Sequence, residues 1–344
     1  MVASFTMLVL GIESSCDETA AAVIEDGRRV LSDVVSSQIA VHARYGGIVP
    51  EVASRQHLLA IVPVLESALS EAEVALGDLD AVAVTYGPGL VGSLVVGVNA
   101  AKAIAFARGL PLVGVHHLEG HTYAAWIEGE PDVDPGFPLI VLIASGAHTD
   151  LVLMRGHGDY EVLGRTRDDA AGEAFDKAGR VLGLGYPGGP AIQRAAEGVE
   201  TPLVLPRAWL GDSLEFSFSG LKTALLHKAQ DLGVYPPPPD GPAPDVVAEL
   251  ASAFQTAVVD VIATKAAEAV RRHGARGLVL GGGVSANALL RRECAERSPV
   301  PVIIPAPRHC TDNAAMIGVA GSYALERGIT HGLELDAVPS LALA

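Results

Sequence analysis

Residues 277–287, GLVLGGGVSAN, form an apolar run that leads directly into a glycine-rich loop and then into a helical pattern. An earlier stretch, AVAVTYGPGLVGS at 81–93, has the same order of strand, glycine loop and helix. Before each stretch, apolar periodicity predicts three strands followed by helical segments. After each stretch it predicts a further strand. Each half therefore follows β-β-β-α-β-α-β-α in outline, which favours a duplicated α/β fold.

Two domains follow from this repeat, which we place at residues 7–136 and 137–330, with a cleft between them. Duplicated α/β domains generally bind nucleotides where the loops at the carboxyl ends of their strands converge. The last helix, about 312–327, is free to pack back on the first domain. The proline-rich stretch 235–245 predicts a surface loop, and the tail after His331 has little pattern and is expected to be dispensable for the chemistry.

Composition places the chain among water-soluble proteins. Of its 344 residues 49% are hydrophobic, yet no uninterrupted apolar run approaches the roughly 20 residues that span a bilayer. The first residues lack the features of a secretory signal, so we expect a cytoplasmic protein without a membrane partner. The net charge of −16 disfavours a broad electrostatic grip on nucleic acid, so an RNA substrate would need partner proteins or a local basic patch.

The segment VHHLEGHTYAAW at 115–126 follows a predicted strand and opens a helix. His117 and His121 are four residues apart, so their rings lie on one helix face and can share a metal ion. The alternative is a pair of helix-terminal or core histidines that make hydrogen bonds. In the second half, PAPRHCTDNAAMIG at 305–318 occupies the matching position, which would bring Asp312 opposite the histidines across the cleft. Two imidazoles and one carboxylate leave coordination positions open and suit a catalytic iron or zinc ion.

A metallopeptidase is the first rival interpretation of this pair. Zinc peptidases use H-E-x-x-H, with the general-base glutamate directly after the first histidine. Here Leu118 follows His117, and Glu119 lies two residues on, on a different helix face. The spacing therefore disfavours a peptidase.

Glycine-rich loops at 87–93, 185–190 and 281–287 lie where strands meet helices. Glycine lets backbone N–H groups approach an anion at a helix N-terminus, so a nucleotide or an acyl-adenylate is the expected ligand. None of the loops is a P-loop or a Rossmann motif, and each alone is equally compatible with a turn. The segment IASGAHTD at 143–150 predicts a hairpin turn. The acidic run at 168–179 has two interpretations: its carboxylates bind a ribose or an amine, or they form a solvated helix face.

Eight motifs now carry a family resemblance from about Met7 to Gly328. They are GIESSCDET, YGGIVPEVASRQH, GPGLVGSL, HHLEGH, DDAAGEAFDKAGRVLGLGYPGGP, FSFSGLKTA, GGGVSAN and CTDNAAMIG. The chain resembles the TsaD family, the tRNA N6-adenosine threonylcarbamoyltransferases, whose members were once classed as glycoproteases. The resemblance implies a duplicated actin-like, sugar-kinase-like (ASKHA) two-domain fold and an acyltransferase.

The resemblance also implies a reaction, in which threonylcarbamoyl-AMP gives its threonylcarbamoyl group to N6 of adenosine 37 in tRNAs that read codons beginning with A. It places one divalent metal, iron in preference to zinc, on His117, His121 and Asp312, and assigns no general base. The implied substrate-binding residues are Ile143, Ala144, Ser145, Gly146, Ala147, Asp176, Gly189 and Asn287.

The implied partners are a TsaB-like paralogue and a TsaE-like ATPase. A second rival is a non-catalytic nucleotide-binding subunit of the same complex, although the intact HHLEGH and TDN motifs disfavour it. One position departs from the family: Ala147 stands where a glycine is usual, and alanine would be strained if this position needs a positive φ.

Overall fold

The computed structural model describes residues 6–128 and 135–343. The chain divides into two compact units. Unit 1 contains the described residues of Met1–Asp132 together with those of Pro305–Ala344, and unit 2 contains those of Val133–Ile304. The end of the chain thus returns to the unit in which the chain began.

Unit 1 is built on a five-stranded sheet with the order β3-β2-β1-β4-β5. Strands β1, β2 and β3 form an antiparallel meander, whereas β4 and β5 run parallel to β1. Their bounds are β1 Leu8–Glu13, β2 Glu18–Glu25, β3 Arg29–Ser37, β4 Ala81–Gly87 and β5 Leu112–His116. Because β1, β4 and β5 are parallel, these three strands end at the same edge of the sheet. Their last residues are Glu13, Gly87 and His116.

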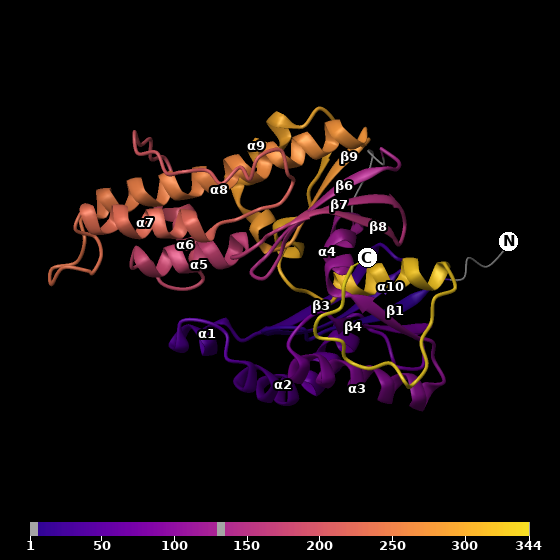
Figure 1. Ribbon diagram of the computed structural model, residues 1–344. Helices are drawn as coiled ribbons and strands as arrows, with labels where there is room; N and C mark the ends of the chain where they lie inside the picture. The colour runs from indigo at the N-terminus through magenta and orange to yellow at the C-terminus, as the bar shows by residue number, and fades with distance from the viewer. Residues whose placement is uncertain (1–5, 129–134, 344) are drawn as a thin grey trace. The chain divides into compact units, whose positions relative to one another are not determined.

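Helices cover both faces of this sheet (Figure 1). The helices of unit 1 are α1 Ile39–His42, α2 Pro50–Glu71, α3 Val91–Arg108, α4 His117–Tyr123 and α10 Ala315–Glu326. Apolar side chains of β1 and β4 form a core with those of α2 and α3. On the opposite face α10 lies so close to β1 that a Cβ on Gly11 would be 2.3 Å from the carbonyl oxygen of Ala314. Glycine at position 11 therefore permits the approach of α10.

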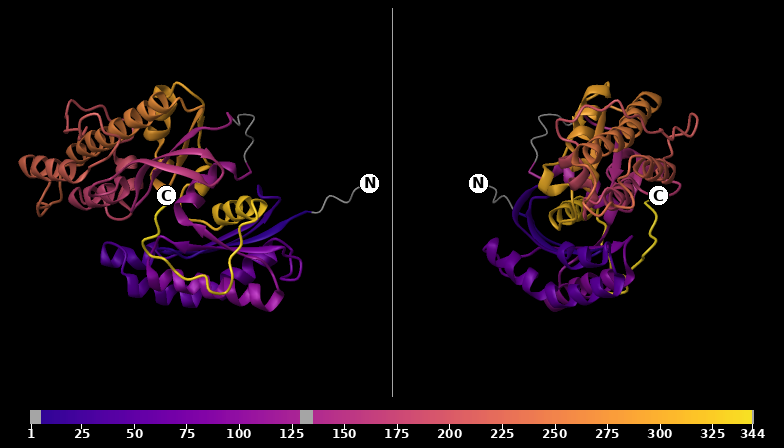
Figure 2. Two further views of the ribbon diagram at one scale, coloured as in Figure 1. Left: turned by 45° about the vertical axis from the view of Figure 1, so that its right-hand side comes forward. Right: turned by 90° about the vertical axis from the view of Figure 1, so that its left-hand side faces the viewer.

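The segment after α10 stays with unit 1 and runs beside its sheet (Figure 2, yellow). His331 forms an antiparallel bridge with Leu112 on β5. Further along, the amide of Val338 donates to the carbonyl of Tyr86 at 2.7 Å. Leu335 is buried in the core of unit 1, so the tail that lacked a sequence pattern is a structural part of the unit.

Unit 2 has its own five-stranded sheet with the order β10-β9-β6-β7-β8. Strands β6, β7 and β8 form an antiparallel meander, and β9 and β10 run parallel to β6. The bounds are β6 Leu139–Ala144, β7 Thr149–Gly156, β8 Asp159–Arg165, β9 Gly277–Gly281 and β10 Val302–Ile303. The topology matches that of unit 1, as the sequence repeat predicts.

The helices of unit 2 gather around one long core helix, α8. They are α5 Ala171–Val181, α6 Gly188–Ala195, α7 Ser219–Asp231, α8 Pro244–His273 and α9 Ala288–Arg297. Their apolar side chains share one core with those of the sheet. Helix α8 begins at Pro244, inside the predicted loop 235–245, because proline is well tolerated at the first position of a helix.

Within residues 6–128 and 135–343, two helices are long and apolar enough to cross a membrane by length and composition, namely α3 and α8. Helix α8 is 72% buried within the structure, as expected for the core helix of a globular unit. Helix α3 packs on β4 and α2 but is only 39% buried. This is weak evidence for a membrane span, and the exposed side of α3 has a different interpretation below.

Candidate metal centre and substrate loops

His117, His121 and Asp312 lie together in unit 1, and their ligand atoms are all within 4.8 Å of one another. The Oδ1 atom of Asp312 is 3.6 Å from Nε2 of His117 and 3.1 Å from Nε2 of His121. Of the side chains, His121 is fully buried and Asp312 is partly exposed. Three potential ligands around a small, partly accessible space can hold one metal ion.

The histidines reach this place because β5 leads directly into α4. His116, the last residue of β5, caps α4 by accepting a hydrogen bond from the amide of Leu118 through Nδ1. The short helix then places His117 and His121 one turn apart, with ring centroids separated by 4.6 Å. The strand end and the cap therefore fix the direction in which both rings point.

Asp312 comes from the loop that precedes α10. Asn313 closes this loop, because its Oδ1 accepts from the amide of Met316 and its Nδ2 donates to the carbonyls of His309 and Thr311. Helix α10 packs against α4. The sequence predicted this aspartate, but it expected Asp312 to approach from the opposite domain. The structure instead places Asp312 in the same unit as the histidines.

The chemistry of the three side chains fits a metal. Both ring nitrogens of His121 are buried, and neither makes a hydrogen bond within the described part of the chain, although Nε2 faces Oδ1 of Asp312 at 3.1 Å. A buried polar atom without a partner is costly, so an ion bound at Nε2 would remove one of these costs. Two imidazoles and one carboxylate also leave coordination positions open for a substrate.

A fourth side chain, Glu13, touches this group. Its Oε2 is 3.0 Å from Nδ1 of His117. Burial alone would raise the pKa of Glu13, but the attraction of His117 outweighs it, so the pKa is lowered. Burial would likewise lower the pKa of His117, but the charges of Asp312 and Glu13 raise it to about 9. In the metal-free protein His117 is thus protonated at neutral pH, and a metal must displace a proton to bind it.

Sequence reasoning missed Glu13, although the sequence does contain a signal for it. The residue ends the apolar strand LVLGIE, where a carboxylate with 0% exposure has to be paired or hydrogen-bonded.

The neighbouring residues Cys16 and Glu18 are uncharged at neutral pH. Burial and the nearby carboxylates of Asp17 and Asp312 raise the pKa of Glu18 to about 9. The same causes raise the pKa of the Cys16 thiol well above its ordinary value. A thiolate is the form of cysteine that binds metals, so Cys16 is a poor fourth ligand.

The predicted substrate turn lies in unit 2, between β6 and β7. The amide of Ser145 donates to the carbonyl of His148, and the hydroxyl of Ser145 accepts from the amide of His148. The amide of Gly172, at the start of α5, donates to the carbonyl of Ser145 at 3.0 Å. A Cβ on Gly282 would be 2.4 Å from the carbonyl oxygen of Ala144. The turn, the N-terminus of α5 and the loop after β9 therefore meet.

Ala147 does not carry the strain that its departure from the family pattern suggested. Among the described non-glycine residues, positive φ occurs only at Asp26, Glu73, Glu128 and Leu210. The turn thus accepts alanine at 147 without a left-handed backbone.

Of the other predicted substrate residues, Gly189 and Asn287 lie at helix N-termini of unit 2, and Asp176 contacts the N-terminus of α6 from within α5. Oδ1 of Asp176 on α5 accepts a hydrogen bond from the amide of Gly188, the first residue of α6, and Gly189 follows it. Asn287 caps α9 through the amide of Leu290. Its Nδ2 donates to Gln255 on α8 at 2.8 Å. Asn287 is therefore held in one orientation by two protein contacts.

Two other predicted elements have internal roles. In the loop GPGLVGS the amides of Gly89 and Leu90 donate to the carbonyls of Pro339 and Ser15, so these two donors are used within unit 1. In the acidic run, Asp168 accepts from the amides of Phe218 and Ser219 at the start of α7. These residues stabilise the fold and are not open to a ligand through these groups.

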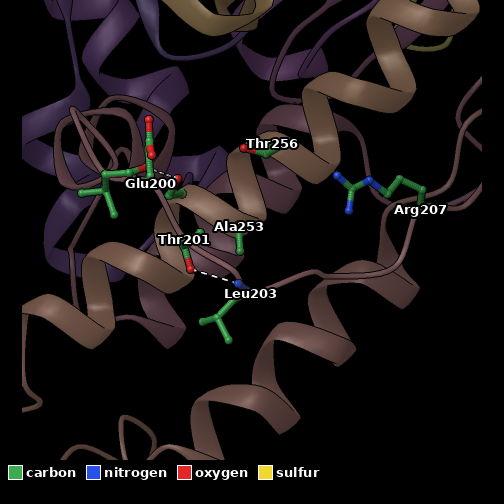
Figure 3. Close-up of a pocket in the computed structure, with 8 residues that line it drawn as sticks. Glu200, Thr201, Leu203, Arg207, Ala253 and Thr256 are labelled. Carbon is green, nitrogen blue, oxygen red and sulfur yellow. Dashed lines mark hydrogen bonds between the residues drawn. The ribbon is translucent and has the colours of Figure 1, made fainter.

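Unit 2 also has a cavity of about 250 Å³ beside α8 (Figure 3). Its lining includes Glu200, Thr201, Arg207, Ala253 and Thr256. None of these is a predicted substrate residue, and Arg207 is paired with Asp260. We therefore assign the cavity no part in the chemistry.

Comparison with solved structures identifies the class of fold. The activator of 2-hydroxyisocaproyl-CoA dehydratase from Clostridium difficile, solved with bound ADPNP, superposes with a TM-score of 0.52 at 13% identity. The match covers 94% of this chain and 99% of the activator. With the two repeated sheets, this confirms the predicted class, a duplicated α/β fold of the actin-like, sugar-kinase-like type.

Comparison of sequences identifies the family. The family model of TsaD, tRNA N6-adenosine threonylcarbamoyltransferase, matches residues 29–319. The enzyme of that name from Thermomicrobium roseum is 56% identical, over 98% of this chain and 97% of its own. The one from Dehalococcoides mccartyi is 55% identical, over 98% and 99%. The chain belongs to the TsaD family of acyltransferases, as the motifs predicted.

Proposed function

We propose that this protein transfers the threonylcarbamoyl group of threonylcarbamoyl-AMP to N6 of adenosine 37 in tRNAs that read codons beginning with A. The observation that carries the proposal is the group of His117, His121 and Asp312 in a member of the TsaD family. The ring nitrogens of buried His121, which make no hydrogen bond among the described residues, support the proposal that the group holds an ion.

The three side chains would hold one divalent metal, and we favour iron over zinc. A metal with open positions supplies a Lewis acid that polarises the acyl carbonyl, which the weakly nucleophilic adenine amine needs. Asp312 supplies the negative charge that retains a divalent ion, and its partly exposed carboxylate lies where a substrate has access. The buried histidines keep water away from the other side of the group.

Residues of unit 2 would bind the donor. We assign this role to the turn Ile143–Ala147, to Asp176 and Gly189, and to Asn287. The support is geometric, because the turn meets the N-terminus of α5, and Gly189 lies in the first turn of α6. Helix N-termini favour anions such as the phosphate of an adenylate, and backbone donors can stabilise the phosphate as AMP leaves.

The charge of unit 1 bears on how the tRNA is held. Unit 1 contains 8 of the 24 Lys and Arg residues but 20 of the 40 Asp and Glu residues. Unit 1 therefore carries most of the excess negative charge, which opposes a phosphate backbone. We propose that a TsaB-like paralogue and a TsaE-like ATPase assemble with this chain in the cytoplasm and help to hold the tRNA.

An exposed apolar surface on α2 and α3 supports a protein partner. It comprises Leu58, Leu59 and Val62 on α2, and Val91, Val95 and Phe106 on α3, with exposures from 38% to 76%. Large apolar residues gathered on two adjacent helices are typical of an interaction surface. A docked partner also accounts for the low burial of α3.

Reconstitution tests the proposal directly. Purified protein, both partners, threonylcarbamoyl-AMP and unmodified tRNA should yield the modified nucleoside, detected by mass spectrometry. The product should be lost with His117→Ala and Asp312→Ala, which a non-catalytic subunit would tolerate. No product, in a mixture where a related enzyme is active, would contradict the proposal, and metal-dependent cleavage of a peptide library would favour the peptidase.

A further inference from the structure

Glu13 is a fully buried carboxylate at the end of β1, and the protein surrounds it with donors. Its Oε1 accepts from the amide of Ser15 at 2.5 Å. Its Oε2 accepts from the hydroxyl of Thr85 at 2.6 Å and lies 3.0 Å from Nδ1 of His117. A buried carboxylate is tolerated only when it is hydrogen-bonded and paired, and Glu13 meets both conditions.

The contact with His117 constrains the state of its ring. Ionised Glu13 is an acceptor only, so the hydrogen bond requires a proton on Nδ1 of His117. The second proton of the charged ring is therefore on Nε2, which lies 3.6 Å from Oδ1 of Asp312, and loss of this proton to a metal leaves the lone pair on Nε2. The hydroxyl of Ser15, 3.1 Å from Nδ1, can only accept from the same proton in this arrangement.

His121 provides an internal comparison, because neither of its ring nitrogens has a hydrogen-bond partner. The two histidines of the group are therefore held differently. Nδ1 of His117 faces a carboxylate from β1, whereas His121, which is fully buried on α4, has only Asp312 near its Nε2 and no such carboxylate at Nδ1.

We propose that Glu13 is a positioning residue of the metal group. It fixes the Nδ1–H tautomer of His117, directs Nε2 towards the ion, and adds a second negative charge beside that of Asp312. A divalent cation is then balanced by two carboxylates, and the imidazole is a stronger ligand because its other nitrogen donates to an anion. Glu13 itself need not touch the substrate.

Metal affinity tests this role. The full-length metal-free protein is titrated with Co²⁺ against a competing chelator, and the visible spectrum of the bound ion is recorded. Glu13→Gln keeps the size of the side chain but removes its charge, so the dissociation constant should rise roughly 10- to 100-fold and the spectrum should change. Affinity within twofold of the wild type and an unchanged spectrum would overturn the proposal.

Thr85→Val is the matched control. It removes another donor to the same oxygen of Glu13 but leaves the carboxylate and its contact with His117, so the Co²⁺ dissociation constant should rise less than about threefold. An equal loss of affinity in both variants would mean that any disturbance of this buried cluster weakens the metal, and would overturn a specific role for Glu13.

A second measurement does not depend on the folding of Glu13→Gln. In ¹⁵N-histidine-labelled wild-type protein loaded with Zn²⁺, NMR should show His117 with its proton on Nδ1 and the metal on Nε2. The His117 signal is assigned by its absence in His117→Gln. The opposite tautomer would overturn the proposal. The inference rests on the proposed metal group but not on tRNA modification, so a failure of transfer with an intact Co²⁺ result would separate the two.

Discussion

The metal group of unit 1 and the substrate turn of unit 2 both follow the ends of strands in two sheets of the same topology, yet they are built differently. In unit 1, side chains converge, and His117 is fixed by a buried carboxylate from another strand. In unit 2 the turn, α5 and the loop after β9 meet mainly through backbone groups, and glycines allow their close approach. A duplicated fold can thus supply metal ligands in one copy and backbone donors in the other.

Removal of a metal ligand should have the largest effect. His121→Ala deletes a buried side chain that offers Nε2 to the ion, and the remaining two ligands cannot retain it. We expect metal content to fall below one tenth of the wild-type value and transfer to fall more than about 100-fold. Metal analysis and single-turnover transfer check both numbers. Wild-type transfer by a metal-free variant would show that unit 1 does not act through a metal.

Removal of the segment after Gly328 should destabilise unit 1 strongly. The described part of the segment makes five hydrogen bonds to β4, β5 and the loop at Gly89. They join His331 to Leu112 and Gly114, Val338 to Tyr86, Pro339 to Gly89, and Leu341 to His116. It also buries Leu335. At about 1 kcal/mol for each bond and about 2 kcal/mol for the leucine, the loss is about 7 kcal/mol.

Hydrogen exchange can locate this loss. Amides of β5 and α4 should lose protection in the truncated protein, whereas those of β6 and β9 should keep it. A truncated protein with unchanged exchange in β5 would show that the segment does not stabilise unit 1.

The close approach in unit 2 is tested by glycine substitutions. Gly282 has φ of +85°, and a Cβ there would be 2.4 Å from the carbonyl oxygen of Ala144. Gly183 also has positive φ, at +70°, but no atom lies within 4 Å of its Cβ position. Gly183→Ala should therefore cost about 1 kcal/mol, and Gly282→Ala about 3 to 4 kcal/mol. Equal thermal unfolding midpoints for the two variants would contradict the proposed contact.

The smallest effect concerns pH. Burial raises the pKa of Asp150 from 3.8 to about 6 in the folded protein, although Arg165 opposes this shift. The folded state therefore binds the proton more tightly, and stability falls as pH rises from about 4 to 6. Asp150→Asn cannot ionise and so does not lose this stability. Its free energy of unfolding should exceed that of the wild type by at most about 3 kcal/mol at pH 8, and by less at pH 5. Urea unfolding of both proteins at the two pH values measures this difference in free energy. An equal difference at pH 5 and pH 8 would contradict the raised pKa of Asp150.

The sequence predicted the strands and the glycine loops well, because each apolar run is bounded by glycine or proline. It also predicted the histidine pair, since a spacing of four residues is a local property of a helix. The contact between Glu13 and His117, and the order of the tail after α10, could not be found in this way. Glu13 meets His117 across 104 residues of chain, and the tail is ordered by backbone hydrogen bonds that leave no pattern in its side chains.

Asp312 shows the same limit in another form. Its motif identified the residue, but the unit to which it belongs depends on how α10 packs. Small residues such as Gly11 and Gly318 permit that packing, and a pattern of small residues does not indicate which sheet a helix will cover.

The central claim is a division of labour, with the metal held by unit 1 and the donor by unit 2. The direct test measures metal content and binding of a non-hydrolysable threonylcarbamoyl-adenylate analogue in His121→Ala and in Asp176→Asn. The account predicts that His121→Ala loses the metal but keeps at least the affinity that the adenylate group of the analogue contributes. It predicts that Asp176→Asn keeps the metal and binds the analogue about tenfold more weakly. Loss of the metal in Asp176→Asn, or full affinity for the analogue in that variant, would contradict it.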